Sequence, residues 1–62
     1  MFVYNLLYEE KLKVHDKAFS DYAELCVVAN DMITETPNID IVVHKFLVHD
    51  DDYYELVDSW KL

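Results

Sequence analysis

The fold of this chain is decided by residues 39–48, which read IDIVVHKFLV. As an extended strand, this stretch carries apolar side chains on both sides, interrupted by His44 on one side and Lys45 on the other. A strand that is apolar on both faces is typical of the middle of a sheet. The sequence therefore predicts a central strand here, followed by a solvated turn at residues 49–52.

The N-terminal residues can supply a neighbour for this central strand. Residues 2–8 are rich in aromatic and branched side chains, which predicts a strand with most of both faces covered. Residues 11–15 alternate between polar and apolar, so Leu12 and Val14 are predicted to point inward. With Glu9-Glu10 near the bend, the two runs are predicted to form a hairpin.

A helix is predicted over residues 20–35. Ser20 or Asp21 can cap its start, and Asp21 with Glu24 has the spacing of a capping box. Pro37 ends it, because proline disfavours helical geometry in the residue before it. Helical periodicity gathers a predicted core stripe of Tyr22, Leu25, Cys26, Ala29, Met32 and Ile33.

The last segment, residues 53–61, fits two patterns. As a strand it places Tyr54, Leu56 and Trp60 on one face, whereas as a helix it matches the i, i+3, i+4, i+7 spacing from Tyr53. The strand is favoured, because a central strand needs a partner and a hairpin supplies the nearest one.

The predicted fold class is therefore α+β, in a single domain over residues 1–62. One amphipathic helix packs on an antiparallel sheet in the order β-β-α-β-β, with a helix kept as the alternative for the last element.

The composition excludes several kinds of chemistry. The chain has 62 residues, 13 Asp and Glu against five Lys, no Arg and no Gly, and a formal charge of −8. Without glycine there is no phosphate-binding loop and no calcium loop of the glycine-turn type. The single Cys26 excludes a disulfide framework and a thiolate zinc site, so no cofactor is expected. Phosphate affinity comes from Lys and Arg, so direct nucleic-acid binding is not expected.

Catalysis is also not expected. Cys26 is predicted to pack in the core stripe, where apolar surroundings make a thiol inert. A domain of this size has little interior left for a cleft that excludes water. A metal-dependent hydrolase built on His44, His49 and Asp51 is a weaker alternative, since the two histidines have opposite parity in a strand.

The compartment is predicted to be the cytoplasm. The N-terminus lacks the basic and apolar regions of a secretory signal, and no run approaches the roughly 20 apolar residues of a membrane span. An acidic surface is also repelled by anionic lipids, so no membrane partner is expected.

The acidic residues are unevenly distributed. Residues 18–62 hold ten acids and two Lys, which accounts for the whole net charge of −8. Acids on the outer side of the helix, together with those of the turn and with Asp40, Glu55 and Asp58, are predicted to form one negative surface that enters a basic groove. Apolar side chains beside them would add specificity. The predicted partner-binding residues are Asp21, Glu24, Val27, Val28, Asp31, Glu35, Asp50, Asp51, Asp52 and Tyr53.

These features resemble a known class of proteins. The chain begins Met1-Phe2-Val3-Tyr4, carries an acidic helix and a His49–Asp52 turn, and ends on Tyr53-Tyr54 and Trp60. It is similar in this to the small acidic proteins that bacteriophages encode, many of which bind and block one host protein. The resemblance implies an inhibitor or decoy in the host cytoplasm, with a basic, nucleic-acid-binding protein as its partner. Some members imitate the charge pattern of DNA.

An alternative is a structural interaction protein whose acidity is incidental. Such a protein would form a homodimer, or would add a partner's strand to an exposed sheet edge. The apolar strand at residues 2–8 is predicted to mediate that pairing.

Overall fold

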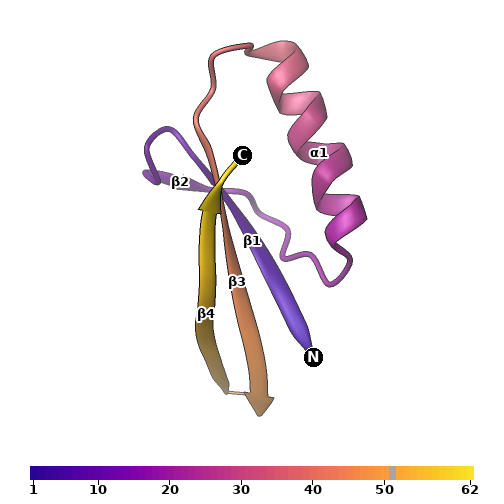
Figure 1. Cartoon of the computed structure of the whole chain (residues 1–62), viewed down its shortest axis with the longest axis vertical. Coiled ribbons are helices and arrows are strands. Elements are labelled where there is room, and N and C mark those ends of the chain that lie inside the picture. Colours follow the sequence, from indigo (N-terminus) through magenta and orange to yellow (C-terminus); the bar gives the residue numbers. More distant parts are fainter. Residues whose placement is uncertain (51) are drawn as a thin grey trace.

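The computed structural model describes residues 1–50 and 52–62, which form one helix and four strands (Figure 1). The strands are all antiparallel, in the sheet order β2-β1-β3-β4, and the helix packs on one face of the sheet. This confirms the α+β class and the β-β-α-β-β order. In chain order the elements are β1 (Phe2–Tyr8), β2 (Lys13–Val14), α1 (Tyr22–Glu35), β3 (Ile41–Asp50) and β4 (Tyr53–Lys61).

The strand β3 is central, as its two apolar faces predict. It pairs with β1 from Phe2 opposite Leu47 to Tyr8 opposite Ile41, and with β4 on its other side. The predicted turn at residues 49–52 is too long, because β3 continues through Asp50. Cross-strand bonding to Tyr53 extends the strand that far. Asp51, part of the predicted turn, lies outside the described residues.

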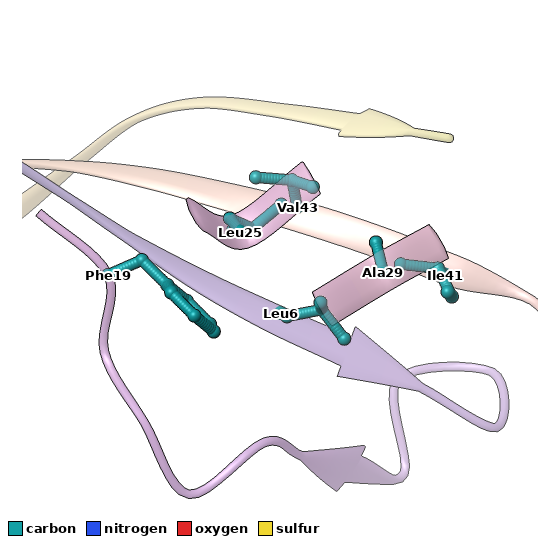
Figure 2. Close-up of a cluster of buried hydrophobic side chains, with 6 residues drawn as sticks. All are labelled: Leu6, Phe19, Leu25, Ala29, Ile41 and Val43. Carbon is teal, nitrogen blue, oxygen red and sulfur yellow. The ribbon is translucent and has the colours of Figure 1, made fainter. Parts of the chain in front are cut away.

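The core lies between α1 and the sheet. Asp21 begins the helix as its cap, with the side chain accepting a hydrogen bond from the Ala23 amide at 3.0 Å. The Tyr22 ring lies between those of Tyr4 and Trp60, with centroid separations of 5.2 and 5.8 Å. Figure 2 shows the buried cluster of Leu6, Phe19, Leu25, Ala29, Ile41 and Val43.

The predicted helix stripe is wrong at two positions. Cys26 is exposed and Ile33 is 39% exposed, whereas Val28 is half-buried and packs against the core. The stripe that packs on the sheet consists of Tyr22, Leu25, Val28, Ala29 and Met32. At about 100° per residue it is turned toward Val28 relative to the predicted stripe, so Cys26 and Ile33 lie beyond its opposite border and face solvent. The prediction that Cys26 packs in the core is therefore wrong, and burial gives no reason for its thiol to be inert.

The second strand is shorter than predicted. Only Lys13–Val14 pairs with β1, and Leu12 and Val14 are 81% and 53% exposed instead of pointing inward. The reason is the turn before it. Glu9, Glu10 and Lys11 all have left-handed backbone angles, with φ of 53°, 58° and 69°, so the turn uses residues that the alternation assigned to the strand.

The other end of β1 is covered by the chain that leads to the helix. Tyr4 and Phe19 exchange two backbone hydrogen bonds, of 2.7 and 2.9 Å. The strand Phe2–Tyr8 therefore has β3 on one side and β2 and Phe19 on the other. The prediction that it forms the edge for a partner's strand is wrong, and β4 is the long edge strand of the described sheet.

A bulge changes which side chains of β4 share a face. Lys45 pairs with Asp58 but Phe46 pairs with Leu56, so Val57 is an extra residue in β4. Trp60 therefore faces α1, while Leu56 faces away from it. The prediction that these two side chains share a face is wrong, because counting by twos assumes that no residue is inserted.

The sheet face that points away from α1 carries no helix among the described residues. Its members follow from the strand register, since side chains on paired residues point to the same side. We call it the open face, and it consists of Val3, Asn5, Leu7, Val14, Val42, His44, Phe46, Val48, Tyr54, Leu56, Ser59 and Lys61.

Candidate protein-binding surface

A groove of about 740 Å³ lies between the C-terminal half of α1 and the β1–β2 turn. Figure 1 shows these two segments toward the same end of the molecule. We call it the acidic groove. Its apolar lining consists of Tyr8, Val28, Met32 and Ile39, and its carboxylates are those of Glu9, Glu10, Asp31, Glu35 and Asp40.

Three chain segments bring these carboxylates together. On α1, Asp31 and Glu35 are four residues apart and lie on the same side of the helix. Tyr8 pairs with Ile41, and antiparallel pairing then places the next residue of one strand, Glu9, near the preceding residue of the other, Asp40. The groove is therefore a product of strand register and helix spacing together.

The carboxylates of the groove differ in how far they are neutralised. The Lys13 ammonium lies 3.4 Å from Glu9, and the Lys61 ammonium lies 3.0 Å from Asp40 Oδ1. The enclosed Asp40 Oδ1 accepts no hydrogen bond within the described part of the chain, so the ion pair is its compensating contact. Of the five groove carboxylates, those of Glu10, Asp31 and Glu35 have no ion-pair partner among the described residues.

The helix adds to the negative potential of the groove. The last turn of α1 contains no basic residue, and Glu35 is its final residue. The C-terminus of a helix carries a partial negative charge, which disfavours nearby carboxylates by about 0.3–1 kcal/mol each. A cation bound in the acidic groove would relieve this repulsion as well as pair with the side chains.

The structure separates the predicted helix residues into two sets. Val28, Asp31 and Glu35 line the acidic groove. Asp21 caps the helix, and Glu24 pairs with the Lys17 ammonium, so neither belongs to it.

Val27 lies on the outer face of the helix and is 62% exposed. It does not line the groove, although the adjacent Val28 does.

The predicted residues of the β3–β4 turn lie elsewhere. Asp50, Asp52 and Tyr53 are exposed, and His49 contacts both the Tyr53 ring at 4.9 Å and the Glu55 carboxylate at 2.7 Å. Figure 1 places this turn and the C-terminus of α1 toward opposite ends of the longest axis, along which the molecule measures 37 Å. The predicted partner-binding residues thus form two separate groups, and Asp51 lies outside the described residues.

Sequence reasoning did not predict three of the five groove carboxylates as binding residues. Glu9 and Glu10 were assigned to the bend of the hairpin, and Asp40 was predicted to lie beside the negative surface without being a binding residue. The available signal was the acidic pair after residues 2–8 together with the acid before Ile41, because pairing of these strands brings both to one end of the sheet.

The structure also bears on the metal alternative. His44 lies on the open face beside Asn5 and Ser59, while His49 contacts Glu55 at the far end of β3. Across residues 1–50 and 52–62, no group of three or more His, Cys, Asp or Glu side chains is placed to hold a metal ion.

α1 is too short and too polar to cross a membrane, and the described residues contain no other helix.

No protein-family model matches this chain, and neither does any curated protein or solved structure.

Proposed function

We propose that this chain is a non-enzymatic protein-binding module whose acidic groove receives a basic, amphipathic segment of a partner protein. The observation that carries the proposal is an apolar-lined groove rimmed by five carboxylates at the negative end of a helix. An apolar side chain of the partner would contact Val28 and Met32, while flanking Lys or Arg side chains would pair with Asp31 and Glu35.

The two components of this surface serve different purposes. Unpaired carboxylates accelerate the encounter with a positive partner, and salt weakens this contribution. Burial of apolar groups supplies affinity that salt does not screen. A partner that combines both is therefore preferred over one that is merely basic.

A nucleic-acid-binding protein is the class of partner that fits best. Such proteins carry clustered Lys and Arg for phosphate contacts. A module that binds these side chains would act as an inhibitor or decoy in the manner of the small phage proteins, within the host cytoplasm. The support for this step is the charge of −8 and the resemblance in size and composition.

The proposal is tested with defined peptides in place of the partner. We would measure fluorescence anisotropy with an amphipathic lysine–leucine peptide and with a lysine–serine peptide of equal length and charge. The lysine–leucine peptide should bind at least about tenfold more tightly. Raising KCl from about 50 to about 300 mM should weaken its binding several-fold.

A matched pair of double variants locates the binding surface. The substitutions Asp31→Asn with Glu35→Gln remove two groove carboxylates, whereas Asp50→Asn with Asp52→Asn remove two at the opposite end. Only the first pair should weaken peptide binding, by about tenfold. Equal losses would show that total charge decides binding, and the groove proposal would be rejected.

The decoy step has its own test. A short DNA duplex should compete with the chain for the lysine–leucine peptide, because both would occupy its ammonium groups. A peptide that binds DNA and this chain simultaneously would contradict the decoy while leaving groove binding intact.

A further inference from the structure

The open face is an apolar surface on which no helix packs among the described residues. Leu7 and Val42 are already buried, at 8% and 7% exposed, so the exposed part of β1 and β3 on this face lies toward the β3–β4 turn. Antiparallel sheets commonly expose one face, but that face is then mostly polar. Here Tyr54 and Leu56 are 52% and 50% exposed, and Val3, Phe46 and Val48 are only half-buried. Connected apolar surface of this kind usually marks an interaction site.

The acids of the chain avoid this face. The chain has 13 Asp and Glu, yet the open face, as defined by the described register, contains no carboxylate. Its charged member in that register is Lys61, which is paired with Asp40. Apart from the Lys61–Asp40 pair, the face therefore carries no Asp, Glu or Lys on a molecule of −8.

The open face is also hollowed at one place. A hollow of about 290 Å³ is lined by Val3, Asn5, Ala18, Phe46 and Tyr54. Leu56, which pairs with Phe46 across the strands, is an exposed apolar side chain on the same face. One face thus offers both a recess and an apolar side chain that can enter the recess of another copy.

We propose that the open face is a homodimer interface, in which two copies pack face to face about a twofold axis as two sheets about 10 Å apart. Two molecules of −8 repel each other wherever unpaired carboxylates meet, and the carboxylate at the border of the open face, Asp40, is paired with Lys61. A partner selected by positive charge would instead be drawn to the acidic groove. The proposal does not depend on the function proposed for that groove.

The dimensions of the sheet determine how strong the proposed dimer is expected to be. Seven paired residues and three to four strands give a flat area of roughly 350–450 Å² on each copy. This is below the roughly 800 Å² per partner of a standard stable interface. We therefore expect a dimer that dissociates at micromolar concentrations and becomes stronger in salt, as the repulsion between copies is screened.

Sedimentation at concentrations from about 1 µM to about 1 mM tests this, at low and high KCl. A reductant must be present, because Cys26 is exposed and could form a disulfide between copies. The expected result is a monomer–dimer equilibrium that shifts to dimer by at least about threefold at high salt. A monomer at every concentration, or assembly beyond a dimer, would overturn the proposal.

Two matched substitutions place the interface. Leu56→Glu on the open face should weaken the dimer at least about tenfold, whereas Val27→Glu on the outer helix face should weaken it less than about threefold. Both residues are exposed, and circular dichroism verifies that each variant remains folded. Tyr54→Glu provides a second open-face variant. A dimer that survives both open-face changes would overturn the proposal.

Amide chemical shifts distinguish face packing from edge pairing. On dilution, shifts at Val3, His44 and Phe46 should change together, because these residues lie across the face on β1 and β3. Changes confined to the outer backbone of β4 would show edge-to-edge pairing and would exclude the face-to-face dimer. Peptide binding to the acidic groove weakens in salt, so the two proposals respond to salt with opposite signs and fail separately.

Discussion

The two faces of the sheet differ in how the chain completes them. On one face, α1 covers Leu6, Ile41 and Val43 so fully that each is at most 1% exposed. On the other, Leu7 and Val42 are buried, but Val3, Phe46 and Val48 are only half-buried and the described residues provide no second helix. A chain of 62 residues buries a smaller fraction of its surface than a larger domain does. The difference teaches that a sequence pattern can make a sheet face apolar even where no helix of the described chain packs on it.

The charges follow the same division. The acidic groove lies on the side of the sheet that carries α1, and the open face lies on the other side. A face-to-face dimer would leave both grooves accessible and pointing outward. Such a dimer would present two binding sites to a partner with repeated basic segments, which raises avidity when both sites are reached together.

The largest expected effect comes from making the same deletion on the two faces. Leu25→Ala should cost about 2–5 kcal/mol, because Leu25 is fully buried against the sheet. Leu56→Ala should cost about 1 kcal/mol or less, because half of that side chain is already exposed. Urea denaturation at dilutions where the chain is monomeric measures both. Similar losses would mean that the open face is as well covered as the core.

A smaller effect on stability is expected when a carboxylate is removed from either end of α1. Glu35→Gln removes a carboxylate from the negative end of the helix and should raise the unfolding free energy by about 0.3–1 kcal/mol. Glu24→Gln removes one from the first turn, together with its pairing to Lys17, and should lower it by a similar amount. Thermal unfolding at low salt measures both. Shifts of the same sign would refute the electrostatic account of the groove.

The smallest effect concerns the outer side of the helix. Cys26→Ser should change the unfolding free energy by less than about 0.5 kcal/mol, because Cys26 is exposed. In the native protein, a thiol reagent should modify Cys26 about as rapidly as it does in urea. Slow modification that requires unfolding would show that Cys26 is buried, as helical periodicity predicts.

The sequence was sufficient for the elements that depend on local pattern. The two-sided apolar run of residues 39–48 predicted a central strand, and the capped periodic segment predicted the helix. Cys26 was misplaced because periodicity shows that the helix has an apolar side but not which edge of that side meets the sheet, and here the edge with Val28 does.

The acidic groove could not be predicted in the same way. It needs Tyr8 opposite Ile41 and a left-handed turn at Glu9, and neither is encoded within one local segment. Likewise, the inserted residue Val57 changes which side chains of β4 face α1, and no distinctive sequence signal marks it. The features that tertiary pairing decides are those that a reading along the chain misses.

The turn at Glu9, Glu10 and Lys11 affects where the folded molecule opens locally. Its three left-handed residues all bear side chains, and this conformation costs roughly 1–2 kcal/mol per residue without glycine. The strained segment borders β2, which has only two paired residues. Local opening, as hydrogen exchange reports it, should therefore begin here, well before the β1–β3 ladder yields. If the groove binds a partner as proposed, one wall would then adjust while its helical wall stays fixed, and a single cleft would admit side chains of different size.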